Sequence, residues 1–329
     1  MFSRALARTD ESRGKFARKE EYRLEPLIQL DTFPVRSVLP LLLQDKTTGK
    51  NIIWATGTYA YLGSYFSDES QITTELVAGI NQDMIQPRIY KTLETQAART
   101  KKHAEVFTPA WICCMMNNHL DEEWFGRADV FNRQDERSWS ATEEPVTFPK
   151  DKTWKQYVDS RRLEITCGEA PFLVSRYDAA EGRLIPIEQR IGLLDRKLRI
   201  VKENAADENE WLKWTIRAFQ SVYGYEYQGD NLLIARINLL MTFADYLEDS
   251  LHRKPTDKEL RKISNILAWN LWQMDGLKGT VPMGVPEENC QQLSLFEQEA
   301  EETVRTNCRI MDWRADCSIQ YSDMKKGGI

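Results

Sequence analysis

The sequence predicts an α/β fold in which a parallel sheet has helices on both faces. Strand-like apolar segments alternate with helical segments through the second half of the chain, and such alternation is typical of parallel sheets. One of these segments, LEITC at residues 163–167, runs into a Cys-Gly turn and then a helix-like stretch up to residue 178. The 329 residues are 42% hydrophobic and 29% charged, so the chain is long and apolar enough to bury a sizeable core.

Three regions are expected along the chain. Residues 1–25 mix charges of both signs and predict a mobile lead-in. Residues 26–99 contain strand signals, notably KNIIWATGTYAYLG after the turn-like DKTTGK, and predict an α+β region. Residues 100–329 hold the alternating segments and predict the main domain. Within this domain the polar stretch 127–155 is expected to be an excursion between core elements.

The helical segments have recognisable ends. Thr108 and Pro109 predict an N-cap followed by the first residue of a helix. The segment DNLLIARINLLMTFADYLEDSL has one apolar stripe at helical spacing, formed by Leu233, Ile237, Leu240, Ala244, Leu247 and Leu251. Thr256 and Glu259 form a capping box, and the helix that it opens is expected to close at Gly276.

Two strand candidates bring polar residues to one edge of the predicted sheet. LEITC is followed by Gly168, which lets the backbone approach a ligand closely. VYGYE ends in Glu226, a carboxylate placed to bond ribose hydroxyls. Ligands of parallel sheets bind at the carboxyl ends of the strands, so these positions predict a site for a nucleotide-like cofactor. NCRIMDW at 307–313 is a further short strand candidate.

Composition narrows the class of protein. A net charge of −6 gives no whole-molecule sign of a nucleic-acid binder, although a local basic face can operate within an acidic protein. No run approaches the roughly 18 apolar residues of a membrane span, and the N-terminus has no secretory signal. Six cysteines without a CxxC pair favour reduced cytoplasmic thiols over zinc sites or disulfides. We expect a cytoplasmic protein with no membrane contact and no bound metal.

Three motifs occur in an order that resembles a known family. EVFTP at 105–109 precedes a helix, and EITCGEAPFL at 164–173 and VYGYE follow. This set resembles the amino-methylating DNA adenine methyltransferases of restriction-modification systems, in particular short modification subunits. Their cofactor domain carries a Phe-Thr-Pro segment and an Asp-Pro-Ala-Cys-Gly-Ser-Gly-x-Phe-Leu loop. In this chain Glu164 replaces the Asp, Glu169 the Ser and Ala170 the second Gly, whereas Cys167 and Gly168 are retained.

The resemblance implies a Rossmann-like methyltransferase sheet that binds S-adenosylmethionine. Glu226 would bind the ribose, and Asp312 of IMDW would lie near the adenine. Asp275 of QMDGL is the alternative for the adenine position, ranked second because the capping box predicts a helix there. The implied cofactor-binding residues are Phe107, Thr108, Pro109, Glu164, Cys167, Gly168, Phe172, Glu226 and Asp312.

One motif of the family is missing. These enzymes hold the flipped adenine with an Asn/Asp-Pro-Pro-Tyr/Phe loop, and this sequence contains no Pro-Pro dipeptide. The domain is therefore expected to stop before the catalytic loop, and no catalytic residue is assigned. The resemblance implies the S-adenosylmethionine-binding component of a DNA adenine methyltransferase in a restriction-modification or related phage-defence system. A protein partner would supply the catalytic loop and target recognition, with DNA as a further partner.

The alternative from a different class is a binding module. A methyltransferase-like fold without transfer activity would bind DNA or protein in a defence or anti-restriction assembly, since fold alone does not fix function. An oxidoreductase that uses a nicotinamide cofactor is disfavoured, because the fingerprint G-x-G-x-x-G is absent.

Overall fold

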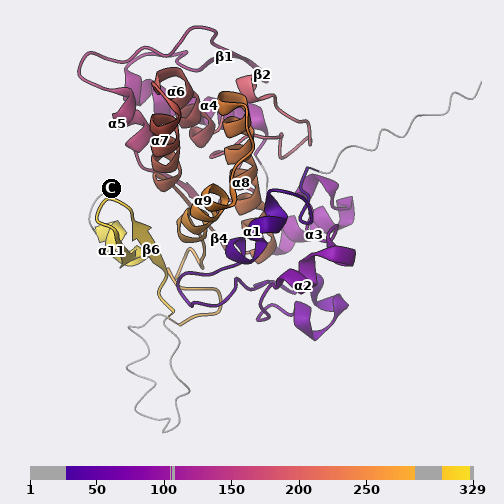
Figure 1. Ribbon diagram of the computed structural model, residues 1–329. Coiled ribbons are helices and arrows are strands. Elements are labelled where there is room, and N and C mark those ends of the chain that lie inside the picture. The colour runs from indigo at the N-terminus through magenta and orange to yellow at the C-terminus, as the bar shows by residue number, and fades with distance from the viewer. Residues whose placement is uncertain (1–26, 104, 106–107, 286–305, 327–329) are drawn as a thin grey trace, which may run out of the picture.

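The computed structural model describes residues 27–103, 105, 108–285 and 306–326, so the lead-in expected at residues 1–25 lies outside the described residues (Figure 1). The helices are α1 (Val35–Leu42), η1 (Gly57–Leu62), η2 (Ser64–Phe66), α2 (Thr74–Val77), η3 (Gly79–Asn81), η4 (Arg88–Tyr90), α3 (Leu93–His103), α4 (Ala110–Phe125), α5 (Trp154–Asp159), η5 (Ile187–Gln189), α6 (Leu193–Asn204), α7 (Glu208–Gln220), α8 (Gly229–Leu251), α9 (Asp257–Asn270) and α11 (Tyr321–Lys326). The strands are β1 (Asn132–Asp135), β2 (Ser138–Ala141), β3 (Arg162–Ile165), β4 (Val222–Glu226), β5 (Leu271–Gln273), β6 (Arg309–Asp312) and β7 (Cys317–Gln320).

Three short strands form a parallel sheet in the order β3-β4-β5. Glu164 in β3 lies opposite Gly224 in β4, and Glu226 at the end of β4 lies opposite Gln273 in β5. The α/β class and the strands expected in LEITC and VYGYE are confirmed. The polar excursion between core elements contains the antiparallel hairpin β1–β2.

The third strand of this sheet corrects an expectation. The capping box of Thr256 and Glu259 is present, with reciprocal hydrogen bonds, but α9 ends at Asn270 rather than near Gly276. The side-chain amide of Asn270 donates to the carbonyl oxygens of Phe219 at 3.0 Å and Val222 at 2.9 Å. These bonds tie the end of α9 to the start of β4, so the next residues continue alongside β4 as β5.

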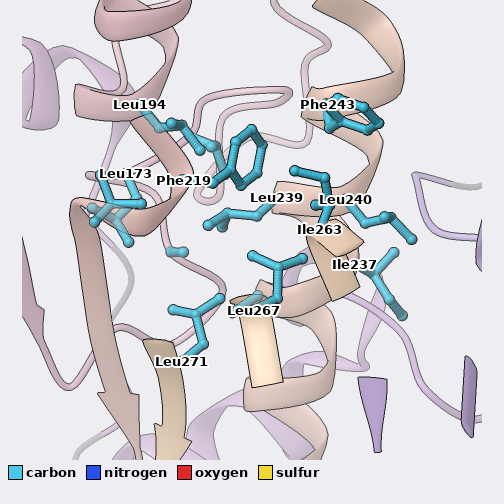
Figure 2. Close-up of a cluster of buried hydrophobic side chains, with 14 of the residues drawn as sticks. Leu173, Leu194, Phe219, Ile237, Leu239, Leu240, Phe243, Ile263, Leu267 and Leu271 are labelled. Atoms are coloured by element: carbon cyan, nitrogen blue, oxygen red, sulfur yellow. The ribbon is translucent and has the colours of Figure 1, made fainter. Parts of the chain in front are cut away.

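Helices α8 and α9 pack against one face of the sheet and enclose the main core. Figure 2 shows Phe219 of α7, Phe243 of α8 and Leu267 of α9 directed into one cluster. The rings of Phe219 and Phe243 meet edge to face, with centroids 6.0 Å apart. Leu240 is fully buried in the same cluster, and its truncation to Ala would cost about 2–5 kcal/mol of stability.

The opposite face of the sheet is covered differently from the expectation. Tyr223, Tyr225 and Trp272 pack there against Ile310 of β6 and Tyr321, the first residue of α11. The strand expected in NCRIMDW exists as β6, but it pairs antiparallel with β7 instead of joining the parallel sheet. Within the described residues, this face is therefore covered by the β6–β7 hairpin and the start of α11 rather than by a layer of long helices (Figure 1).

The N-terminal region contains less strand than its β-branched and aromatic residues predict. Pairing is limited to isolated bridges such as Ile53 with Gln71, and GTYAYL forms the 3-10 helix η1. The backbone N–H of Ile53 donates to the Gln273 side chain at 2.9 Å, and the Trp54 carbonyl accepts from Gly229 at 3.2 Å. These backbone groups dock the segment on β5 and α8, so tertiary contacts override its strand propensity.

The structure also differs from the helices expected at two places, the start of α4 and the stretch after Gly168. Helix α4 begins one residue late, with Pro109 as N-cap and no hydrogen bond from a capping side chain. The carboxylate of Asp178 accepts from the Ala110 N–H at 3.0 Å and satisfies this helix end from a distant loop. The helix-like stretch expected after Gly168 is wrong, because residues 169–178 form turns and the next α-helix begins at Leu193.

Candidate cofactor site

A cavity of about 430 Å³ lies at the carboxyl ends of the three parallel strands. Its wall includes residues 166–168 after β3, Tyr227 and Gln228 after β4, and Asp275 after β5. Glu105, from the segment before α4, closes another side. Parallel strands end at the same edge of a sheet, so the fold itself brings these separate turns together.

Glu226 joins two of the turns that form the cavity. One carboxylate oxygen accepts from the Gly168 N–H at 2.9 Å. The other accepts from the N–H groups of Tyr227 at 3.0 Å and Gln228 at 3.1 Å. Burial raises the pKa of Glu226 above its usual range, and the three N–H donors counteract this effect. Glu226 therefore shapes the site as well as lining it.

Glu164 is a second buried carboxylate in the wall. Its two oxygens accept from the N–H groups of Phe172 at 3.3 Å and Leu173 at 3.1 Å. Burial raises the pKa of Glu164 to about 8, and the nearby Glu226 carboxylate acts in the same direction. A cation bound in the cavity would favour the ionised form of both carboxylates.

Two residues of the turn after β3 have the left-handed backbone conformation that glycine adopts most readily, and one of them is an alanine. Gly168 has φ +53°, and Ala170 has φ +64°. Both lie in the left-handed region, which costs a residue with a Cβ about 1–2 kcal/mol. Ala170 accepts this conformation while it is fully buried, and its N–H donates to the Cys167 carbonyl. Ala170 therefore adopts the left-handed conformation that glycine adopts more readily.

Glu169, which stands where the resembling family has serine, has a structural role that the sequence did not indicate. It is 2% exposed, and its carboxylate accepts from the Arg88 N–H at 2.6 Å and from the Tyr177 hydroxyl at 2.6 Å. Burial raises the pKa of Glu169 to about 6. The longer side chain thus ties the turn after β3 to the N-terminal region.

The structure brings most of the predicted site residues to this one cavity, namely Thr108, Glu164, Cys167, Gly168, Phe172 and Glu226. Pro109 caps α4 next to the cavity and does not line it, and Phe107 lies outside the described residues. Cys167 is 1% exposed, and burial raises the pKa of its thiol well above the ordinary value, which disfavours the thiolate that a nucleophilic role would need.

Asp312 lies outside the cavity, whereas Asp275, the alternative that the sequence offered, lines it. Asp312 accepts from Arg161 at 3.1 Å and from the N–H groups of its own turn, and it does not line the cavity. Asp275 follows β5 and does line it. Its Oδ1 accepts from the N–H groups of Leu277 and Lys278 at 3.0 and 3.2 Å. Asp-Gly after an aromatic, apolar run was the available signal for a strand ending in a turn.

The wall also contains residues that the sequence does not predict: Glu105, Thr166, Pro171, Tyr227, Gln228 and Asn231. Most of them follow a strand directly or lie inside a quoted motif, so position along the chain was the signal that could have found them. Gln228 and Asn231 both donate to Glu105, at 3.1 and 3.2 Å. Because these partners are more than a hundred residues apart in sequence, no local pattern indicates the contact.

Within the described part of the chain, four acidic side chains line the wall, and this composition favours a cationic ligand. Carboxylates of Glu105, Glu164, Glu226 and Asp275 surround the cavity, and the turn after β3 offers a close backbone approach. Among the described residues there is no group of three or more histidines, cysteines and acids suited to a metal ion. The arrangement supports binding and orientation more directly than nucleophilic catalysis.

No family model, curated protein or solved structure matches this chain. Within the part of the chain that the structure describes, no helix combines the length and the apolar character needed to cross a bilayer.

Proposed function

We propose that this chain is the S-adenosylmethionine-binding component of a DNA adenine methyltransferase, in a restriction-modification or related defence system. The observation that carries the proposal is the meeting of Gly168, Glu226 and Asp275 in one cavity at three parallel strand ends. It is joined by the motif resemblance, which covers roughly residues 100–320.

The residues present fit this cofactor. Its sulfonium and ammonium groups are cationic, and the cavity wall carries several carboxylates. When bound, it would supply an electrophilic methyl group. Glu226 would accept from the ribose hydroxyls, and Asp275 would accept from the adenine amine. Glu164 would hold the turn after β3 through its bonds to Phe172 and Leu173.

We infer that methyl transfer also needs a loop that these 329 residues lack. The sequence has no Pro-Pro dipeptide, so it lacks the loop that binds the flipped adenine in the family it resembles. We assign that loop, and target recognition, to a protein partner. The same absence favours the second candidate function, a catalytically inactive module that binds DNA or protein in a defence or anti-restriction assembly.

Calorimetric titration with S-adenosylmethionine tests the site with matched variants. Asp275→Asn and Asp312→Asn both alter a carboxylate that accepts N–H bonds in a turn, but only Asp275 lines the cavity. We expect Asp275→Asn to weaken binding about tenfold or more, because it removes an acceptor of the adenine amine. Asp312→Asn should leave the affinity unchanged. Equal effects of the two variants would contradict this assignment of the site.

A further inference from the structure

Glu169 lies in the turn after β3, but its side chain is not part of the cavity wall. Its neighbours Gly168 and Pro171 line the cavity. The carboxylate of Glu169 instead accepts from the Arg88 N–H of η4 and from the Tyr177 hydroxyl, each at 2.6 Å. These bonds are made to a carboxylate that is 2% exposed, so they are charge-assisted and shielded from solvent. Glu169 therefore joins the cavity turn to two segments that lie outside the cavity.

Asn238 of α8 holds the same residue from a third segment. Its side-chain amide donates to the Glu169 carbonyl oxygen at 3.0 Å and to the Tyr177 hydroxyl oxygen at 3.0 Å. Asn238 and Tyr177 are both buried. The Tyr177 hydroxyl is a donor to Glu169 and an acceptor from Asn238, so the three groups form one connected network.

The turn contains backbone conformations that residues with a Cβ rarely adopt. Thr166 has φ +50° and Ala170 has φ +64°, and both lie in the left-handed region. This region is unfavourable for alanine, and a β-branched residue such as threonine is a genuine outlier there. Backbone of this kind persists only where the surrounding structure over-determines it. The hydrogen bonds of Glu169, the residue before Ala170, provide such a constraint.

We propose that Glu169 is a positioning residue of the cofactor site, which holds residues 166–171 in the conformation that the ligand requires. This inference rests on the proposed function. Glu169 would act through the backbone of the turn, since Thr166, Gly168 and Pro171 line the cavity. The N-terminal region thereby gains a role in binding, because η4 provides one of the two donors to the carboxylate.

Protonation of Glu169 would weaken this hold. An ionised carboxylate accepts at both oxygens, whereas a protonated one directs an O–H toward a neighbour that is itself a donor. Burial raises the pKa of Glu169 to about 6, the bonds from Tyr177 and Arg88 and the Lys91 ammonium act against this shift, and the Glu105 carboxylate acts with it. The affinity for the cofactor should therefore fall as the pH drops through 6.

The contribution of Glu169 to stability should change in the opposite direction. Folding raises the pKa of this carboxyl from 4.5 to about 6, so its contribution is complete below 4.5 and declines as the pH rises through 6. Protonation thus favours the folded chain while it weakens the hold on the turn. A residue with only a general role in folding would not separate affinity from stability in this way.

Calorimetric titration of the full chain with S-adenosylmethionine, above and below pH 6, tests the role. Above 6, Glu169→Gln should bind about tenfold more weakly than the wild type, because the amide keeps one acceptor and turns a donor toward the other neighbour. Below 6 the wild type should approach the variant. Other carboxylates titrate in both chains, so the ratio of the two affinities isolates Glu169. Glu181→Gln, at an exposed side chain, should follow the wild type throughout.

Labelling of Cys167 with iodoacetamide, followed by peptide mass spectrometry, tests the hold on the turn without any ligand. Cys167 lies in the turn and is 1% exposed. Above pH 6, Glu169→Gln should raise its labelling rate several-fold, and the ratio to the wild type should approach one below 6. Cys308, which is buried in another cluster, reports general unfolding and should label at an unchanged rate.

A second variant protects the test against a folding defect. Tyr177→Phe removes one donor to Glu169 and should raise the labelling of Cys167 alone, by a smaller factor. Labelling of Cys308 to the same extent as Cys167 in both variants would overturn the positioning role, as would equal affinities of Glu169→Gln and the wild type above pH 6. If the wild type binds no S-adenosylmethionine, the proposed function fails, and the labelling rates still decide whether Glu169 holds the turn.

Discussion

Glu226 is the residue on which the geometry of the site depends most directly. Its carboxylate accepts three backbone N–H bonds, from Gly168, Tyr227 and Gln228. Glu226→Ala would leave these donors unpaired and should lower the free energy of unfolding by on the order of 3 kcal/mol, as denaturant titration would show. Glu226→Gln retains one acceptor oxygen and should lose less stability. Similar stabilities for the Ala variant and the wild type would contradict the structural role.

This role changes how a binding experiment on Glu226 has to be interpreted. Loss of cofactor binding in Glu226→Ala would follow from disorder of the turns alone. The Gln variant is more informative, because it keeps the size of the side chain while it replaces one ribose acceptor with a donor.

The buried carboxyl of Glu164 predicts how the stability of the protein depends on pH. Its pKa rises from the ordinary 4.5 to about 8 in the folded chain, because burial disfavours the charged form. Between these values the folded chain binds more protons here than the unfolded chain. Stability from this group is therefore complete below pH 4.5 and declines as the pH rises toward 8. The thermal midpoint of the ligand-free protein should fall over this range.

Glu164→Gln provides the comparison for this pH profile. The variant cannot ionise at this position, so its thermal midpoint should change less with pH. A smaller slope should remain, because burial also raises the pKa of Glu169, to about 6. Parallel profiles for the variant and the wild type would show that Glu164 does not titrate in this way.

At the scale of elements, the contact between the N-terminal region and α8 is close enough to test with a methyl group. A Cβ added at Gly229 would lie 2.0 Å from the Ile53 carbonyl oxygen. Both atoms are fixed by the backbone, so a change of side-chain rotamer cannot relieve the clash. Gly229→Ala should separate residues 51–54 from α8 and lower the melting temperature by several degrees or more. Gly57→Ala is the matched control, since a Cβ there has nothing within 4 Å. Equal melting temperatures for the two variants would contradict this contact.

The strands and helices that the sequence predicted correctly are those with strong local signals. The long apolar stripe of α8 and the capping box of α9 depend on residues close in sequence. The end of α9 was missed because it is set by Asn270, whose partners lie near residue 220. Because α9 ends there, Asp275 follows a strand and lines the cavity, whereas the sequence placed it in a helix and favoured Asp312. The strands expected around residue 53 were lost because their backbone groups bond to Gln273 and Gly229.

The residues of the candidate site also fall into those that the sequence predicts and those that depend on distant contacts. Gly168 and Glu226 were predicted because each follows or ends a recognisable strand, whereas Glu164 was predicted only from its place in the motif that resembles the family. Glu105 and Gln228 were not, since their place in the wall depends on a contact between distant segments. The division of the chain into residues 26–99 and 100–329 stays a prediction, although α1 contributes Leu39 and Leu42 to the same core as α8.

At the scale of the whole molecule, we expect the chain to bind the cofactor without transferring its methyl group. The isolated chain should bind S-adenosylmethionine but incorporate no labelled methyl group into DNA, because the Pro-Pro loop is absent. Scintillation counting of DNA incubated with the chain and tritiated cofactor measures this. Incorporation above that of a Glu226→Gln control would show that these residues contain a catalytic group of another kind.

The central claim is that the cavity at the strand ends holds S-adenosylmethionine. Calorimetric titration of the wild-type chain with this compound tests it most directly. We predict saturable binding at one site per chain, displaced by S-adenosylhomocysteine. A titration without saturable heat at millimolar ligand would contradict the claim, and the role of a binding module without cofactor would then be the better account of the fold.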